Sequence, residues 1–366
     1  MFSHSLFLTQ TFSRPRFSLV SPRPRGTVVK TFQSRKIYSM EKIEHKQVKI
    51  NDINMHIAEK GKGPTILFLH GFPELWYSWR HQILYFAAHG YHAVAPDLRG
   101  YGSTTTVSSK GGDASKFSIF HLVEDIVSLI DVIAPNEEKI LVVGHNWGTI
   151  IAWYLCLFRP DRVKAFVALS VHFLHRNPDP AKKFADVFRV MYGDDHYIWR
   201  FQEPGDIESE FAKVGVKKVL KKFLTFRDPA SIRFPKTEKF INSYDAPVAL
   251  PPWLSDDDLN YYVANFQKTG FTEGINYYRA LNLDWELLGP WTGAQVKVPA
   301  KFMVGELDLV YHMPGAKEYI HEGGFKKDVP LLDDEIVVME GVAHYINQEK
   351  PEDVNNHIHH FFQKHS

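Results

Sequence analysis

The stretch KILVVGHNWGTIIAWYLCLF (139–158) decides the fold, because it joins an apolar run, a Gly-x-Asn-x-Gly turn and an apolar helical segment. A strand that turns sharply into a helix in this way is typical of a nucleophile elbow, which holds one side chain up at the end of a sheet. The residue held up is normally Ser, Cys or Asp. Here it is Asn146, whose neutral carboxamide is a poor nucleophile.

Strand-like and helical segments alternate on both sides of this stretch. The run QVKINDINMHIAEKG predicts a hairpin with its turn at Asn51–Asp52. Apolar residues at helical spacing mark WYSWRHQILYFAAHG and SIFHLVEDIVSLIDVIA, and an amphipathic helix is expected from Pro351. The continuous apolar runs, typical of buried parallel strands, are TILFLHGF (65–72), HAVAPDL (92–98), KILVVGH (139–145), KAFVALS (164–170), AKFMVGELD and EIVVMEGVAH. The sequence therefore predicts an α/β domain on a mainly parallel sheet.

Residues 172–295 interrupt this alternation with aromatic, Pro-bounded helical pieces. We expect a helical insertion between the sixth and seventh strands, and we call it the lid (172–295). An insertion at this point lies over the carboxyl ends of the strands, where open α/β sheets bind ligands. The predicted core is then made of residues 40–171 and 296–366.

The composition of the 366 residues is that of a globular protein, with 44% hydrophobic residues and a net charge of +1. Near-neutral charge argues against a nucleic-acid groove, and no apolar run is long enough to predict a membrane span. With Cys156 as the single cysteine, neither an intrachain disulfide nor a cysteine metal site is possible. The histidines His357, His359 and His360 do not share one helical face, apart from the 357/360 pair. We therefore expect no metal.

The first forty residues differ from the rest. They are rich in Ser, Arg and Phe, and the first acidic residue is Glu41. Such acid-poor leaders are typical of organelle transit peptides. We expect residues 1–39 to be a transit peptide for a plastid or mitochondrion, or otherwise a disordered leader of a cytoplasmic protein.

Three candidate catalytic residues follow predicted strands. Asn146 lies in the elbow, Asp308 follows KFMVGELD, and His344 follows VVMEGVAH. The chain order of nucleophile, acid and histidine is that of the α/β-hydrolase triad. Because the carboxyl ends of parallel strands meet at one edge of a sheet, we expect these three side chains to converge.

The loop HGFPELWYSW (70–79) supplies a second element of the predicted site. In this fold the N–H after the nucleophile and one from the loop after the third strand form the oxyanion hole, which here means the backbone N–H groups of Trp147 and Phe72. Gly71 and Pro73 suit a backbone folded tightly against a reacting atom, and we expect Pro73 to be cis.

The segments HGFPELWYSWR, VAPDLRGYG, GHNWG, YGDDHYI, TGFTEGINYYRAL, GELDLVYH and EGVAHYINQEKP resemble those of plant soluble epoxide hydrolases, from Met40 to the end of the chain. This resemblance implies an α/β-hydrolase core with a helical lid and no cofactor. It also implies a reaction in which an elbow Asp attacks an epoxide carbon and forms an alkyl-enzyme ester. Water then hydrolyses the ester and releases a vicinal diol.

The resemblance also implies roles for individual residues. Tyr197 in DDHYI and Tyr278 in NYYRAL match the lid tyrosines that hold and protonate the epoxide oxygen, with Tyr192 and Tyr277 as the alternatives if the register differs by a few residues. His344 with Asp308 matches the pair that activates water. Glu74 and His145 match positions that line the site of that water.

Asn146 departs from the family pattern, which has Asp. Three accounts stay open: the chain is an Asp-to-Asn variant of an enzyme, it is a non-catalytic ligand-binding member, or Asn146 is a precursor that the site itself converts to Asp. A haloalkane dehalogenase, with Trp147 binding the halide, is a further alternative, although an expelled halide needs no phenolic acid.

The substrate class implied is a small lipophilic epoxide. We expect aromatic side chains around it, with Trp76, Trp153 and Phe266 as candidates. Regiochemistry and oligomeric state do not follow from the sequence.

Overall fold

The structure, a computed structural model, describes residues 43–106, 113–236 and 249–365. The chain separates into two units, Met1–Ile37 and Tyr38–Ser366, and all described residues belong to the second. The leader predicted over residues 1–39 lies outside the described residues.

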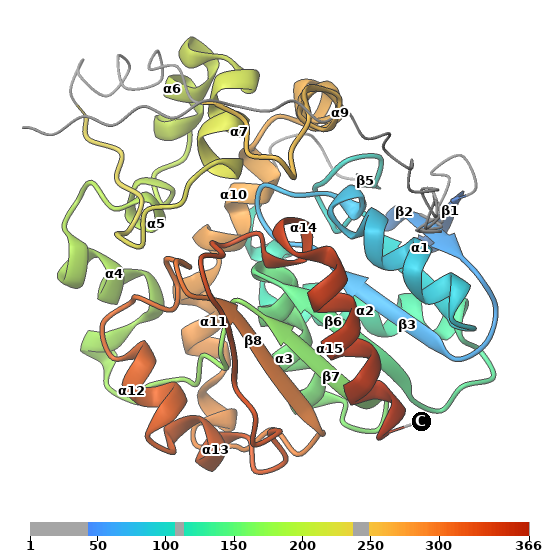
Figure 1. The fold of residues 1–366 in the computed structure, drawn as a ribbon. Coiled ribbons are helices and arrows are strands. Elements are labelled where there is room, and N and C mark those ends of the chain that lie inside the picture. Colours follow the sequence, from blue (N-terminus) through green and yellow to red (C-terminus); the bar gives the residue numbers. More distant parts are fainter. Residues whose placement is uncertain (1–42, 107–112, 237–248, 366) are drawn as a thin grey trace, which may run out of the picture. The chain divides into compact units, whose positions relative to one another are not determined.

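The second unit is built on one large sheet with the strand order β1-β2-β4-β3-β6-β7-β8-β9, in which β5 pairs with β2 beside this path (Figure 1). The pairs β1–β2, β2–β4 and β2–β5 are antiparallel, and every other pair is parallel. The strands are β1 (Glu44–Ile50), β2 (Ile53–Lys60), β3 (Thr65–Leu69), β4 (His92–Pro96), β5 (Thr105–Thr106), β6 (Ile140–His145), β7 (Val163–Leu169), β8 (Ala300–Gly305) and β9 (Val337–Met339). The α/β fold class and the hairpin turn at Asn51–Asp52 are confirmed.

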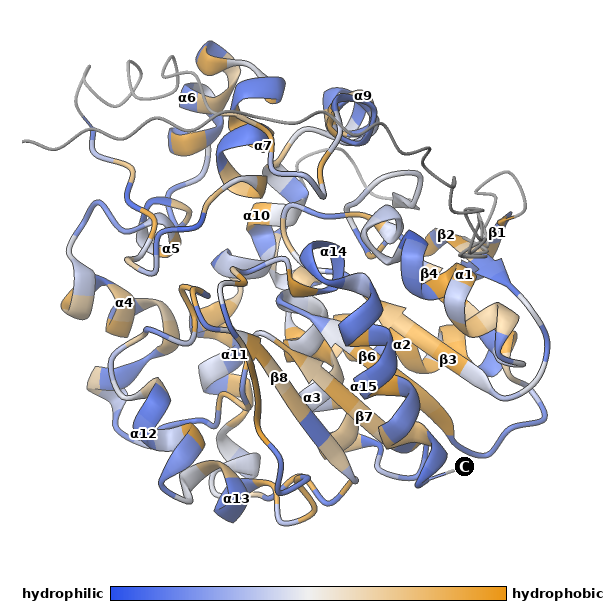
Figure 2. Ribbon diagram, viewed as in Figure 1, coloured by the Kyte–Doolittle hydropathy of each residue, from blue (hydrophilic) through white to orange (hydrophobic). Residues whose placement is uncertain are grey.

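The central strands are apolar on both sides because helices cover both faces of the sheet. All residues of β3 and β6 are buried, and Figure 2 shows these strands mostly in the hydrophobic colour. Along β3, Leu67 and Leu69 join the core on one face, while Ile66 and Phe68 join the core on the other. This alternation follows from the two-residue period of a strand.

The helices of the core divide between these two faces. Buried residues of α2 (Ile119–Ile133) and α3 (Trp147–Phe158) pack on one face, and those of α1 (Arg80–Ala88) and α15 (Pro351–Gln363) pack on the other. The remaining short helices of the core are η2 (Trp76–Trp79), η3 (Ala114–Phe117), α12 (Ala316–His321), α13 (Gly324–Asp328) and α14 (Ile346–Glu349).

Between β7 and β8, the described residues form helices joined by loops, as expected, with one isolated bridge between His196 and Arg233 (Figure 1). We expected six strands before this segment, and the structure has seven, because the two-residue β5 also pairs in the sheet. The helices are η4 (Pro180–Lys182), α4 (Phe184–Tyr192), α5 (Tyr197–Arg200), α6 (Asp206–Val214), α7 (Val216–Leu224), α9 (Asp256–Thr269), α10 (Thr272–Arg279), α11 (Leu281–Leu287) and η5 (Gly289–Trp291). The domain limits at 172 and 295 stay a prediction.

None of the helices in the described ranges has both the length and the apolar character needed to cross a bilayer.

One lid side chain caps a core helix. Asp284 of α11 is buried, and its Oδ1 accepts the Ile119 N–H at the start of α2 at 2.9 Å. The N-cap residue of α2, Ser118, makes no such side-chain bond. Burial raises the pKa of Asp284 to about 7, although the bond from Ile119 opposes the rise. Burial outweighs this bond, so the folded state favours the neutral carboxyl group of Asp284.

This cap makes stability depend on pH. Because the folded-state pKa of Asp284 is raised, the stabilisation is complete below its ordinary value of 3.8 and is lost as the pH rises through about 7. Asp284→Asn keeps a neutral acceptor. The difference in free energy of unfolding between this variant and wild type should therefore change with pH. We expect it to shift by about 2–3 kcal/mol in favour of the variant when the pH is raised from 5 to 8, as measured by urea unfolding.

The matched control is Asp179→Asn, which changes an exposed cap that accepts the Ala181 N–H at 3.0 Å. Its difference from wild type should stay nearly constant over the same pH range. A constant difference for Asp284→Asn as well would contradict the prediction.

Candidate active site

The elbow at Asn146 has a backbone conformation that its neighbours impose. Asn146 has φ 51° and ψ −119°, between the end of β6 and the start of α3. A Cβ at position 148 would lie 2.0 Å from the Leu69 carbonyl oxygen, and one at position 144 would lie 2.6 Å from the Gly148 carbonyl oxygen. No side chain therefore fits at either glycine of the Gly-x-Asn-x-Gly turn. Asn146, between them, has backbone angles that L-residues rarely adopt.

The Asn146 carboxamide lies between a backbone donor and the histidine. Its Oδ1 accepts the Phe72 N–H at 3.0 Å, and its Nδ2 lies 2.9 Å from His344 Nε2. With the oxygen facing an N–H, the amide nitrogen donates to the histidine lone pair. The Phe72 N–H therefore contacts the side chain of residue 146, as the sequence predicts. The Phe72–Pro73 peptide bond is cis, as expected. A place for the Trp147 N–H in the oxyanion hole stays a prediction.

His344 is also bound on its other side. Its Nδ1 lies 3.0 Å from Asp308 Oδ1, and both side chains are almost fully buried. Because Nε2 accepts from Asn146, Nδ1 carries the proton and donates it to the carboxylate. Burial alone would raise the pKa of Asp308, but His344 and the Val310 N–H lower it below its ordinary value. The three predicted residues therefore converge, with His344 in the middle.

Ser170 is a neighbour of this pair that the sequence analysis missed. Its hydroxyl lies 3.0 Å from His344 Nδ1, its side chain is buried, and its φ is 76°. The signal was present, because Ser170 ends the apolar run KAFVALS at the same edge of the sheet. A strained, non-glycine residue against the histidine is typical of a functional site.

Two lid tyrosines share a small cavity with Asn146 and His344. The cavity has a volume of about 20 Å³, and its lining residues are Phe72, Asn146, Tyr197, Phe223, Phe226, Ile232, Tyr278, Leu309, His344 and Tyr345. The alternatives lie elsewhere: the Tyr277 hydroxyl donates to the Arg99 carbonyl oxygen, and Tyr192 stacks on His196. The structure thus brings together Tyr197 and Tyr278, not their neighbours in sequence.

Both tyrosines are neutral phenols at physiological pH. Burial raises the pKa of Tyr197, and the charge of Asp308 adds to the rise. Burial also raises the pKa of Tyr278, although a hydrogen bond with the Trp147 side chain opposes it. The rings of Trp147 and Tyr278 meet edge to face, with 5.1 Å between their centroids. The tyrosine protons are therefore retained and can be donated.

Behind the cavity lies a buried ion pair of Glu74 and His145. Glu74 Oε2 lies 2.6 Å from His145 Nδ1 and accepts the Gly71 N–H at 2.9 Å. His145 Nε2 lies 2.7 Å from the His344 carbonyl oxygen. Since both ring nitrogens face acceptors, His145 is an imidazolium. Burial opposes both charges, but their attraction raises the pKa of His145 and lowers that of Glu74.

Gln348 continues this network toward the lid, and the sequence analysis missed it. Its Nε2 donates to Glu74 Oε1 at 3.3 Å, and its Oε1 accepts from Arg80 at 2.9 Å and from Tyr262 of α9 at 3.2 Å. Because two donors face its oxygen, the amide nitrogen must face Glu74. Gln348 lies four residues after His344, which is the only signal that the sequence offered.

Aromatic side chains line the cavity, as expected, but the three residues named as candidates were wrong. Trp76 packs on His45 and His56, and Trp153 packs on Phe166 and Phe325. Phe266 stacks on Phe271. None of the three lines the cavity, which takes its phenyl rings from Phe72, Phe223 and Phe226.

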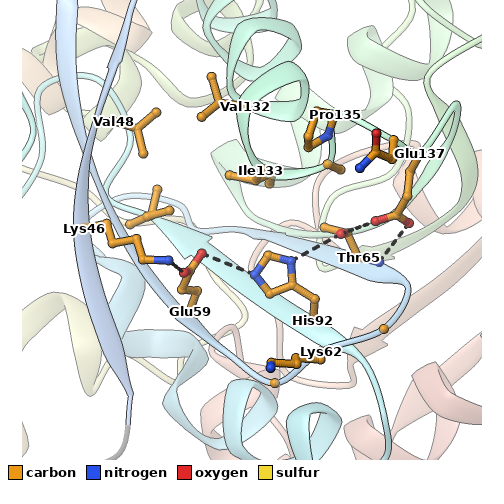
Figure 3. Close-up of a pocket in the computed structure, with 15 residues that line it drawn as sticks. Lys46, Val48, Glu59, Lys62, Thr65, His92, Val132, Ile133, Pro135 and Glu137 are labelled. Carbon is orange, nitrogen blue, oxygen red and sulfur yellow. Dashed lines mark hydrogen bonds and ion pairs between the residues drawn. The ribbon is translucent and has the colours of Figure 1, made fainter.

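A larger groove of about 510 Å³ lies at the amino ends of the strands (Figure 3). Figure 3 shows Lys46, Glu59, His92, Thr65 and Glu137 joined in one chain of ion pairs and hydrogen bonds. Thr65 begins β3 and His92 begins β4. Asn146, Asp308 and His344 instead follow the carboxyl ends of β6, β8 and β9. The groove therefore lies apart from Asn146, Asp308 and His344, and these five polar residues bond to one another.

Within the three described ranges, no group of three or more His, Cys, Asp or Glu side chains could hold a metal ion. Cys156 is buried, and burial raises the pKa of its thiol.

Known proteins resemble this chain over most of its length. Residues 64–206 match the family model of the alpha/beta hydrolase fold. Epoxide hydrolase 2 of Siraitia grosvenorii is 56% identical over 325 residues, which are 89% of this chain and 100% of that protein. Epoxide hydrolase A of Mycobacterium tuberculosis is 34% identical over 84% of this chain and 93% of its own length. The structure of potato epoxide hydrolase I has a TM-score of 0.84 and 61% identity, covering 88% of this chain and 100% of that one.

The Glu74–His145 pair should support the fold. We expect Glu74→Gln to lower the free energy of unfolding by about 3–5 kcal/mol near pH 6, because it leaves a buried cation without its partner. Since the pKa of His145 is raised by Glu74, the stabilisation is lost as the pH rises through that pKa, so the deficit of the variant should shrink in alkali. Urea unfolding at a series of pH values measures both effects.

Glu286→Gln is the control, because it breaks an exposed 2.8 Å pair with Lys183 and should leave unfolding almost unchanged. A deficit for Glu74→Gln that stays small at every pH would show that the buried pair is not ionic.

Proposed function

Because this chain belongs to the epoxide hydrolases of the α/β-hydrolase fold, we propose that its cavity opens lipophilic epoxides to vicinal diols through an ester on residue 146. One observation carries the assignment of roles: Tyr197 and Tyr278 line the same cavity as Asn146 and His344. Two neutral phenols opposite the elbow suit a reaction in which an oxygen, not a halide, must be protonated as it leaves.

In the first half-reaction, the epoxide oxygen accepts hydrogen bonds from the two phenols. A carboxylate at position 146 attacks one ring carbon, the C–O bond breaks, and a tyrosine donates its proton to the alkoxide. The Phe72 N–H, 3.0 Å from Oδ1, stabilises the carbonyl oxygen of the resulting ester.

In the second half-reaction, His344 takes a proton from water, and the water oxygen bonds to the ester carbonyl carbon. The bond between that carbon and the alkyl oxygen then breaks, and the proton of the new carboxyl group goes to the alkyl oxygen, which releases the diol. The imidazolium proton returns to the tyrosinate left by the first half-reaction. Asp308 holds the imidazole in the tautomer with Nδ1 protonated and stabilises the imidazolium. His145 and Glu74 lie behind His344, and the bond from His145 to the His344 carbonyl oxygen fixes the backbone there.

Asn146 affects the first half-reaction most. The carboxamide has no negative charge, and its amide nitrogen occupies the lone pair of His344. We infer that the Asn146 form binds ligands but opens epoxides very slowly. The same feature favours the second candidate function, a ligand-binding protein. The halide-binding alternative has less support, because the Trp147 ring packs edge to face on Tyr277 and Tyr278 and is not among the residues that line the cavity.

The cavity lining favours a lipophilic substrate. Apart from Asn146, His344 and the tyrosines, the wall consists of Phe72, Phe223, Phe226, Ile232 and Leu309. Pockets for drug-sized ligands measure about 300–1,000 Å³, so lid side chains must move apart to admit such an epoxide. An aryl oxirane is a suitable probe.

The decisive measurement is diol release from an aryl oxirane by freshly purified wild type and by Asn146→Asp. We expect Asn146→Asp to turn over at least about 10³-fold faster, since a carboxylate supplies the missing nucleophile. If neither protein releases diol, the proposed reaction is wrong, and halide release from a chloroalkane would then favour the dehalogenase alternative.

Tyrosine variants in the Asn146→Asp background test the phenols. Tyr197→Phe and Tyr278→Phe should each slow ester formation by about 10²-fold, because a general acid is lost. Tyr192→Phe, on the lid but outside the cavity lining, is the matched control and should not change the rate.

We also propose that residues 1–39 direct the protein to a plastid or mitochondrion, on the strength of their acid-poor composition. A fluorescent protein fused behind residues 1–40 should enter one of these organelles in plant cells. Diffuse fluorescence equal to that of the unfused reporter would contradict this and favour the cytoplasm.

A further inference from the structure

Asn146 occupies a position where the site can hydrolyse its own amide. We propose that the His344–Asp308 pair converts Asn146 to aspartate by direct hydrolysis, so that the chain produces its own nucleophile. This inference rests on the proposed function, because it assigns to the amide the water chemistry of the second half-reaction.

The surroundings of the Asn146 carboxamide suit nucleophilic addition of water to its carbonyl carbon. Oδ1 accepts the Phe72 N–H at 3.0 Å, which is the bond that stabilises negative charge on this oxygen in a tetrahedral intermediate. The elbow backbone prevents the side chain from moving away, because Gly71 approaches it so closely that a Cβ there would lie 2.5 Å from Oδ1. The amide carbonyl is therefore held in place against its donor.

The leaving group faces the nitrogen that protonates it once His344 has taken a proton from water. Nδ2 lies 2.9 Å from His344 Nε2, and the Nδ1 of the same ring lies 3.0 Å from Asp308. A histidine in this position can accept a proton from the attacking water and return it to the departing nitrogen, as in acyl transfer by serine proteases. The cavity of about 20 Å³ that Asn146 and His344 both line is large enough for one water.

The reaction balances without a further reactant. Water loses a proton to His344 Nε2 and forms a C–O bond to Cγ of Asn146, while Oδ1 takes up negative charge. The intermediate collapses, the C–N bond breaks, and the imidazolium proton goes to the leaving nitrogen. The products are an aspartate carboxylate at position 146 and ammonia, which takes the remaining proton as ammonium.

Spontaneous deamidation would proceed differently. It requires the Trp147 backbone nitrogen to attack Cγ and form a succinimide, which opens to a mixture of aspartate and isoaspartate. Trp147 is the first residue of α3, and its bulky side chain packs on Tyr277 and Tyr278. Direct hydrolysis gives aspartate alone, and its new oxygen comes from the solvent.

The test is a time course in water enriched in heavy oxygen at neutral pH, starting from freshly purified full-length protein. Cleavage after Lys139 and Arg162 in ordinary water releases residues 140–162, in which Asn146 is the only asparagine. We expect this peptide to change from amide to acid with one heavy oxygen and no isoaspartate. Diol release from the aryl oxirane should rise in parallel.

His344→Gln should slow the conversion by about 10²-fold or more, because it removes the acid and base together. Asp308→Asn is a second variant, should His344→Gln fail to fold by circular dichroism. His312→Gln, which changes an exposed histidine, is the matched control and should convert like wild type.

The outcomes separate this inference from the proposed function. If the peptide keeps its amide while Asn146→Asp releases diol, self-conversion is wrong and the proposed function stands. If the peptide converts with His344 required but Asn146→Asp releases no diol, the conversion is real and the proposed reaction is wrong. Isoaspartate in the product, or equal rates in wild type and His344→Gln, would overturn the inference.

Discussion

The close approach of two loops, the one after β3 and the one after β6, is the constraint on which the site depends. β3 and β6 are adjacent and parallel, with Leu69 opposite Gly144, so the chain leaves both strands at the same level. The loops then come so near that no side chain fits at Gly71 or Gly148. Asn146 takes a strained conformation between them, at a cost of about 1–3 kcal/mol, which the start of α3 offsets through the Thr149 N–H on the Asn146 carbonyl oxygen. This packing alone sets the side chain of residue 146 against the Phe72 N–H.

Electrostatics distinguish residue 146 from the groups around it. The buried charges near the cavity occur in pairs, Glu74 with His145 and Asp308 beside His344. A buried charge without a partner is costly, so each of these two carboxylates is stabilised by the histidine beside it. A carboxylate at position 146 would have only the Phe72 N–H and a shared histidine, and this weak compensation makes it reactive. The amide of Asn146 removes this charge and, with it, the proposed reactivity.

The sequence predicted the sheet and the main catalytic cluster because both follow from local patterns. Apolar runs identify buried strands, and polar residues directly after them, such as Asp308 and His344, are brought together by the topology. Ser170 followed the same rule but was missed, because its role depends on a positive φ that no sequence pattern reveals. Gln348 was missed because its partner Arg80 is 268 residues away in the chain. Trp76, Trp153 and Phe266 were wrongly placed, since the size of a side chain does not tell which way it points.

In the proposed reaction, the lid contributes to both half-reactions through different helices, and this follows from where its side chains enter the core. Tyr197 of α5 and Tyr278 of α10 line the cavity beside residue 146, where the epoxide oxygen is released. Tyr262 of α9 instead donates to Gln348, which in turn donates to Glu74, the partner of His145. His145 contacts the backbone of His344, so this second path ends at the residue proposed to activate water. A displacement of the lid therefore disturbs the acid that opens the epoxide and the support of the base that hydrolyses the ester. The proposed conversion of Asn146 needs His344 but neither lid tyrosine, and it differs in this from epoxide opening.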